Sequence, residues 1–292
     1  MKSNKKYIRT LGSLLQESVD YCFVSDKCFD NSELLVNFED NLRIQREEFY
    51  TLGDPSKCTH VSVVDCWCLL LNENEKNKES SKKFFFNASS SLALLDFNNS
   101  GGSQQIDLIY DSWVKWVDFN QVDLSKFDLI VVPILKGSQY FLLLLNMKLR
   151  IVQWIDNVNH TAISEEEIRK LGDTMKDLLS TIFDDKMQAT DVIPLWKMER
   201  VPTDWKTTVR TNIESDVFMM MSMLFFEGTV DFQCPILNAA PLRHVARAKI
   251  AGSLVLSDLN KQRSKVLEEV SNFKDKRRSI AKQVSIRRLK IR

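Results

Sequence analysis

Three apolar segments near the middle of the chain, separated by short turns, constrain its fold most strongly. They are DLIVVPI at 128–134, YFLLLLNM at 140–147 and RIVQWI at 150–155. Lys136–Ser138 reads as a turn, and tight links of this kind join antiparallel neighbours. The pattern therefore predicts a three-stranded antiparallel meander at the centre of a sheet.

The segments around this meander follow mostly helical periodicity. Helices are expected at Val61–Asn72, Asp107–Trp116, Glu165–Ile182, Val217–Phe226 and Pro241–Asn272, a strand at Leu195–Val201, a loop at Asn87–Gln105, and a largely helical segment at 1–60. The order predicts an α+β fold with one central, mostly antiparallel sheet flanked by helices. We expect an N-terminal helical extension at 1–50, a main domain at 51–262 and a basic helix or tail at 263–292.

Cysteine and histidine usage argues against a metal site. The six cysteines form no paired C-x-x-C set and the three histidines are scattered, so we expect neither zinc nor another cofactor.

We find no signal-peptide pattern at the N-terminus and no apolar run long enough to span a membrane. The expected location is intracellular, in the nucleus or cytoplasm.

Charge is concentrated at the C-terminus. Nine of the 40 Lys and Arg residues lie at 274–292, beside one acidic residue, Asp275; the remaining chain has 31 basic and 38 acidic residues. A basic segment of this kind indicates either a nuclear-import or nucleic-acid patch or the solvated face of a terminal helix. We favour the solvated face and do not expect nucleic acid as the main partner.

Five patterns then occur in a fixed order. They are VVDCWCLLLN at 63–72, VVPILKGSQYFLLLLNMK at 131–148, VQWIDN at 152–157, TNIESDVFMMM at 211–221 and RHVARAKI at 243–250. Together, over roughly residues 50–260, they resemble the SUMO-specific (ubiquitin-like-modifier) cysteine proteases, especially the branch found in plant transposon-associated proteins. The resemblance implies a papain-like or adenain-like peptidase fold.

The resemblance also implies a Cys-His-Asp triad and a glutamine that helps form the oxyanion hole. By motif position, the histidine falls on Gln139, and the tryptophan that follows it falls on Tyr140. The acid falls on Asp156 and is retained. The cysteine falls on Ser215, and the oxyanion glutamine falls near Arg210.

The same motifs imply where a binding groove would lie. Asn212 matches the family's asparagine, and Tyr140, Trp154 and Asn212 are the residues assigned to the groove. The implied partner is a protein, either SUMO or another ubiquitin-like modifier.

The departures remove the family's chemistry. A glutamine amide neither accepts nor gives up a proton at neutral pH, so Gln139 cannot act as a general base. A serine hydroxyl is far harder to ionise than a thiol, and Ser215 would need such a base. Glu214 and Asp216 add negative charge beside Ser215, although both suit a helix start as caps or first-turn residues.

Three functions remain open at this point. The first is a pseudoprotease that keeps the fold and binds a ubiquitin-like modifier or its conjugates. The second is an active desumoylating or deubiquitinating cysteine peptidase that uses other residues, such as Cys234 with His244, or His160 as a substitute base. The third is an interaction protein that uses its basic tail.

Cys66 and Cys68 lie in an apolar run and are expected to be core thiols.

Overall fold

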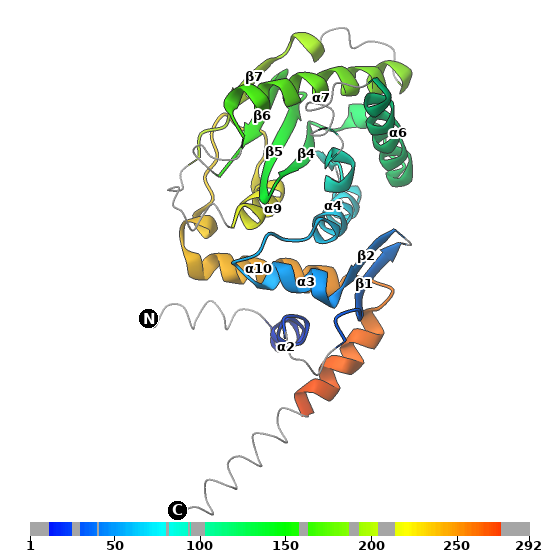
Figure 1. The fold of residues 1–292 in the computed structure, drawn as a ribbon, viewed down its shortest axis with the longest axis vertical. Helices are drawn as coiled ribbons and strands as arrows, with labels where there is room; N and C mark the ends of the chain where they lie inside the picture. Colours follow the sequence, from blue (N-terminus) through cyan, green and yellow to red (C-terminus); the bar gives the residue numbers. More distant parts are fainter. Residues whose placement is uncertain are drawn as a thin grey trace, which may run out of the picture.

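The computed structural model describes residues 12–24, 30–39, 41–79, 82–92, 94, 103–157, 163–186, 193–203 and 214–275 (Figure 1). The helices are α2 (Ser13–Cys22), α3 (Arg46–Gly53), α4 (Val61–Lys76), α6 (Ser103–Asn120), α7 (Glu165–Lys186), α9 (Ser215–Phe225) and α10 (Ala240–Val255). The strands are β1 (Leu34–Glu39), β2 (Leu42–Gln45), β3 (Lys83–Phe85), β4 (Leu129–Lys136), β5 (Gln139–Asn146), β6 (Ile151–Ile155) and β7 (Lys197–Arg200). The mixture of helices with one main sheet confirms the expected α+β class.

The main sheet has the order β3-β4-β5-β6-β7. The predicted meander is confirmed, since β4, β5 and β6 pair antiparallel. Both outer strands, β3 and β7, run parallel to their neighbours, so the sheet is more mixed than the sequence indicated. The turn between β4 and β5 has two residues, and Gly137 supplies its positive φ of 61°. This turn makes Gln139 the first residue of β5.

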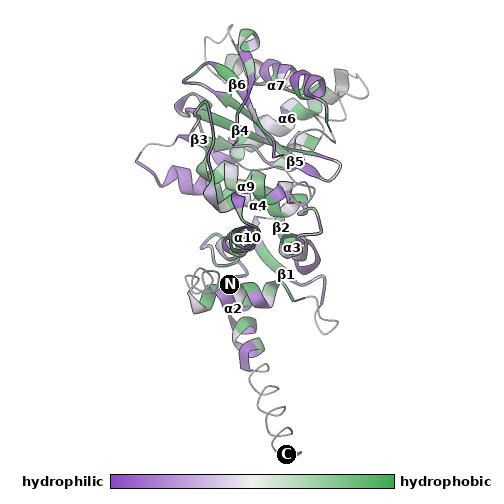
Figure 2. Cartoon of the chain, turned by 90° about the vertical axis from the view of Figure 1, so that its left-hand side faces the viewer, coloured by the Kyte–Doolittle hydropathy of each residue, from purple (hydrophilic) through white to green (hydrophobic). Residues whose placement is uncertain are grey.

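Helices cover both faces of the sheet. Seven of the eight residues of β5 are buried, which requires apolar cover on each side. In Figure 1, α6 and α7 lie on one side of the central strands, and α4 and α9 lie on the other. Figure 2 shows the hydrophobic strands between these layers and more hydrophilic residues on α7. The long apolar runs of the sequence are therefore the core of the domain.

A further layer lies beyond α4 and α9. It contains α10 and α3 with the β1–β2 hairpin at one end and α2 below (Figure 1). The hairpin corrects the expectation that residues 1–60 are helical, because residues 34–45 form two antiparallel strands. Leu35, Val36 and Ile44 are fully buried there, so a tertiary surface stabilises this short ribbon. The three-domain division stays a prediction.

The C-terminal helical pattern is interrupted, which corrects the single helix predicted over Pro241–Asn272. The first helix, α10, ends at Val255 and helical structure resumes at 263. Asn260 fixes the break: its Oδ1 accepts from the Asn37 amide (3.0 Å), and its Nδ2 donates to the carbonyls of Leu35 (3.0 Å) and Val255 (2.9 Å). The break therefore joins α10 to β1.

Two other boundaries differ from the expected ones. Within the predicted loop at Asn87–Gln105, residues 88–92 are helical and α6 already begins at Ser103. The strand predicted at Leu195–Val201 is shorter, because a 3-10 turn at Ile193–Leu195 precedes β7. Both differences concern short segments in which local propensity is weak.

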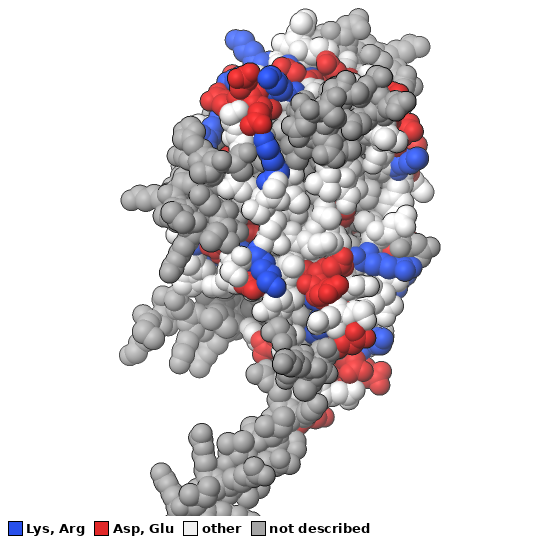
Figure 3. Space-filling model, viewed as in Figure 1, with Lys and Arg blue, Asp and Glu red and all other residues white. Residues whose placement is uncertain are grey.

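Charged side chains gather away from the sheet. On the face seen in Figure 3, acidic and basic residues alternate along α7, where Arg169 pairs with Glu165 and Lys170 with Glu166. One buried exception is Lys83, whose Nζ donates to the carbonyls of Leu224 (2.9 Å) and Phe226 (3.0 Å) at the end of α9. Among the described residues, no helix combines the length and hydrophobicity needed to cross a membrane.

Candidate functional site

The residues matched to the triad lie at the ends of three neighbouring elements. Gln139 opens β5, Asp156 directly follows β6, and Ser215 is the first residue of α9. The strands β5 and β6 are paired up to Leu142 and Ile155, so Gln139 and Asp156 lie at the same end of the sheet. Positions separated by up to 76 residues in sequence are thus brought to one edge.

The Ser215 hydroxyl is held inside the protein. The Tyr140 backbone N–H donates to Ser215 Oγ at 3.0 Å, and Ser215 has no exposed surface. This hydrogen bond ties the start of α9 to the start of β5, one residue from Gln139. A side chain that is fully buried and already accepts a backbone hydrogen bond offers little to an incoming substrate. In this structure Ser215 is a structural contact between α9 and the sheet.

Two buried ion pairs flank Ser215. Arg243 Nε donates to Glu214 Oε2 at 2.7 Å, and the two terminal guanidinium nitrogens of Arg247, Nη1 and Nη2, donate to the Asp216 carboxylate at 2.9 and 3.0 Å. The Arg247 and Asp216 side chains are each 1% exposed. The carboxylates are therefore balanced by cations from α10. The unbalanced negative charge expected beside Ser215 is not present.

Of the two carboxylates expected to cap the start of α9, only Asp216 accepts a hydrogen bond from a backbone N–H of the helix. Glu214 occupies the N-cap of α9 but makes no side-chain cap hydrogen bond, because its carboxylate faces Arg243. Asp216 Oδ1 does accept from the Val217 N–H at 2.8 Å, while Thr59 Oγ1 donates to Oδ2. Asp216 is thus both a first-turn residue of α9 and the centre of a buried polar cluster.

The predicted groove residues are buried in the free chain. Tyr140 is 1% exposed and its hydroxyl donates to the Thr59 carbonyl at 2.9 Å; burial raises its pKa well above the usual value. Trp154 is 3% exposed, with the Arg169 guanidinium 5.3 Å from its ring centroid. Arg210 and Asn212 lie outside the described residues. The groove assignment stays a prediction.

Other thiols offer no activated nucleophile in the described part of the chain. Cys66 and Cys68 are fully buried, as expected for core thiols, and burial raises both pKa values. Burial and the nearby Asp216 charge raise the pKa of Cys58 to about 12. Cys234, considered as an exposed nucleophile with His244, is 3% exposed. His160, the considered substitute base, lies outside the described residues.

A buried carboxyl near this site should give the fold a pH dependence. Burial raises the pKa of Asp65 to about 6, although the Ser89 hydroxyl and the Ser89 N–H (3.1 Å) both donate to its carboxylate and oppose this rise. The folded state therefore binds this proton more tightly than the unfolded state, and its stability falls as pH rises from about 4 to about 6.

We expect Asp65→Asn to remove that dependence. Asparagine keeps an acceptor oxygen for Ser89 but cannot ionise, so the variant should gain about 3 kcal/mol relative to the native chain between pH 4 and pH 7. Urea unfolding of both proteins across this range measures the difference. A constant difference at all pH values would contradict a raised pKa at Asp65.

Three residues of the site were not predicted from the sequence: Thr59, Arg243 and Arg247. The signal for the arginines was present, because they are four residues apart and so share one face of a helix that is otherwise mainly apolar. The acids on either side of Ser215 were the complementary signal. Their pairing depends on α10 lying against the start of α9, which the sequence alone did not specify.

Comparison with known proteins gives a consistent result for the fold. Neither a protein-family model nor a curated protein matches the chain. Among solved structures, the C-terminal Ulp1 protease domain in complex with Smt3, the yeast ortholog of SUMO, superposes with a TM-score of 0.62 at 14% identity, covering 86% of this chain and 97% of that one.

Two further structures agree. The catalytic domain of the Chaetomium thermophilum Ulp1-like SUMO protease gives a TM-score of 0.56 at 14% identity, covering 84% of this chain and 89% of that one. A de-sumoylating protease gives 0.51 at 18% identity, with 80% and 95% covered. The strand order and helices described above are thus similar to those of solved SUMO proteases over most of their length. The chain has the α+β, papain-like fold of the Ulp1-type SUMO proteases.

Proposed function

We propose that this chain is a SUMO-protease-like protein that no longer cleaves and acts by binding a ubiquitin-like modifier or its conjugates. The observation that carries the proposal is the state of position 215. A hydroxyl replaces the expected thiol, is fully buried and accepts the Tyr140 N–H. The similarity to a protease domain solved with Smt3 supports the choice of partner class.

The surroundings of Ser215 support the loss of chemistry. A nucleophile needs a base within hydrogen-bond reach, and the residue matched to the base is Gln139, whose amide does not accept a proton at neutral pH. The ion pairs of Glu214 and Asp216 with α10 hold the start of α9 in place, and neither pair supplies a base that could take the Ser215 proton. These contacts stabilise the start of α9.

The proposal is tested in two parts. SUMO and ubiquitin vinyl-sulfone probes should leave the native chain unlabelled, while an active SUMO protease in the same assay is labelled completely. Titration with unmodified SUMO and ubiquitin should give saturable binding to at least one of them. Covalent labelling would disprove the loss of chemistry, and absence of binding across a panel of modifiers would disprove the binding role.

Substitution at the site edge locates the binding surface. Gln139 is partly exposed at the start of β5, so Gln139→Arg should place a bulky charge in the modifier's path and weaken binding by about tenfold, the cost of burying a poorly paired charged group. Gln121, exposed beyond α6, offers the matched control Gln121→Arg. Equal affinity in the two variants would place the binding surface elsewhere.

A further inference from the structure

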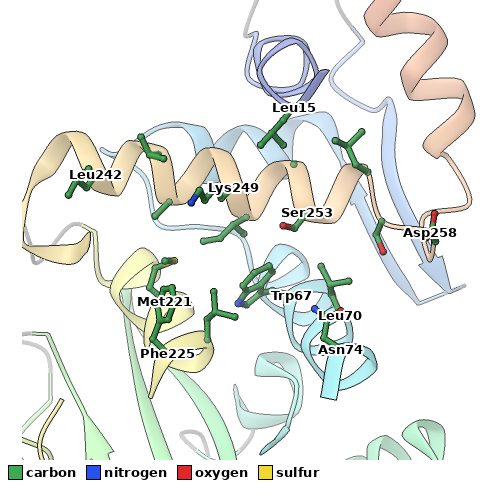
Figure 4. Close-up of a pocket in the computed structure, with 17 residues that line it drawn as sticks. Leu15, Trp67, Leu70, Asn74, Met221, Phe225, Leu242, Lys249, Ser253 and Asp258 are labelled. Atoms are coloured by element: carbon green, nitrogen blue, oxygen red, sulfur yellow. The ribbon is translucent and has the colours of Figure 1, made fainter. Parts of the chain in front are cut away.

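An apolar cavity lies at the opposite end of α9 from Ser215. It has a volume of about 680 Å³, is open on one side and lies between α4, α9, α10 and the start of α2 (Figure 4). Ser215 begins α9 and Phe225 ends it, so the two sites are separated by about 15 Å of helix. The cavity therefore lies away from the end of α9 where Ser215 and Gln139 meet.

The interior of the cavity is apolar. Trp67 and Leu70 on α4, Met221 on α9, and Val245 and Ile250 on α10 line it, and each is at most 8% exposed. The Trp67 Nε1–H is directed to the Met220 carbonyl at 3.4 Å, so the indole presents mainly its carbon atoms to the space. The volume falls within the roughly 300–1,000 Å³ typical of small-molecule sites.

The mouth of the cavity has a different character. Leu224 and Phe225 stand at its edge, 38% and 44% exposed, so two adjacent apolar side chains border the opening. Lys249, Ser253 and Asn74 add polar side chains to the lining at exposed positions. Figure 4 shows Lys249 and Ser253 on the side of α10 that faces α4 and α9.

The charge at this mouth is one-sided. Lys249 and Ser253 are four residues apart on α10 and so share a face, and the side chains of Lys249, Ser253 and Asn74 make no hydrogen bond or ion pair within the described part of the chain. The other ionisable lining residue, Asp258, is 94% exposed and paired with Arg263. The mouth thus offers one uncompensated cation with two neutral hydrogen-bonding side chains.

We propose that this cavity binds an amphiphile with an apolar chain and a single anionic head, of which a long-chain carboxylate is the simplest example. The chain fills the space between Trp67, Met221 and Ile250, and the carboxylate accepts hydrogen bonds from Lys249 Nζ and Ser253 Oγ. A small molecule is favoured over a protein helix because the volume of the cavity matches a small-molecule site and because the cation stands beside the opening.

The test is calorimetric titration of the full chain with dodecanoate below its micelle concentration, and with dodecan-1-ol as the neutral match. The native chain should bind one dodecanoate saturably and the alcohol more weakly. Lys249→Met should weaken dodecanoate binding by about tenfold, the usual range for one charged hydrogen bond, and leave the alcohol unchanged. Lys265→Met, an exposed lysine beyond the cavity lining, should behave as native.

A second variant tests the cavity itself. Ser253 is exposed, so Ser253→Trp should fold normally and close the mouth, abolishing binding of both ligands. Absence of saturable dodecanoate binding, equal binding by the Lys249→Met variant, or undiminished binding by Ser253→Trp would each overturn the proposal. So would sedimentation showing a native dimer that Ser253→Trp dissociates, since a second copy of the chain would then cover the opening.

Discussion

Replacing Arg247 with methionine is expected to destabilise the protein by about 3–5 kcal/mol, because it leaves the Asp216 carboxylate buried without its cation. Asp216 has no exposed surface, and Arg247 is its bidentate partner. The same guanidinium also donates to the Leu52 carbonyl at 2.9 Å, so α3 loses a contact as well. Chemical denaturation of the variant against the native chain measures the loss.

The double variant Asp216→Leu with Arg247→Met separates the ion pair from packing. Removal of both partners leaves no unpaired charge, so the double variant should be more stable than Arg247→Met alone. Arg263→Met supplies the exposed control, since Arg263 pairs with the highly exposed Asp258 and should cost below about 1 kcal/mol. If Arg247→Met and Arg263→Met lowered the free energy of unfolding equally, the buried ion pair would contribute no more to stability than the exposed one.

Restoring the family residues is expected to restore covalent labelling by a modifier probe. The revertant carries Gln139→His, Arg210→Gln and Ser215→Cys. Loss of a triad nucleophile or base typically lowers the rate about 10⁶-fold. The native chain should therefore stay unlabelled by the probe, and the revertant should be labelled. A thiol at position 215 lies at the start of α9, where the helix favours the thiolate.

The structure refines how this reversion is made. The family resemblance implies an Asp-Cys-Gly motif whose glycine falls on Asp216, but Asp216→Gly would leave Arg247 buried and unpaired. Adding Asp216→Gly to the revertant should therefore lower its stability by an amount similar to Arg247→Met. The variant with Gln139→His and Arg210→Gln alone is the control and should stay unlabelled. A folded, modifier-binding revertant that fails to label would show that the motif assignment is out of register.

Local sequence patterns determined the core of the fold. The β4–β5–β6 meander follows from three apolar runs and from a turn in which Gly137 adopts positive φ, features that act within a few residues. The helix α7 follows from helical periodicity, and α4 and α9 follow from long apolar runs that read as buried helices. The residue types at 139 and 215, matched to the base and the nucleophile by resemblance, predicted the loss of both groups.

The tertiary structure alone decided the state of the site. The β1–β2 hairpin and the break after Val255 depend on each other through Asn260, which lies more than 200 residues from its partners in β1. Likewise, Glu214 and Asp216 lie 29 and 31 residues before the arginines that neutralise them. Propensity and periodicity act over one or two turns of chain, whereas charge pairing and burial depend on which surfaces meet. The sequence therefore identified a serine at the position matched to the nucleophile, and the packing of α9 against β5 decided that this serine is buried.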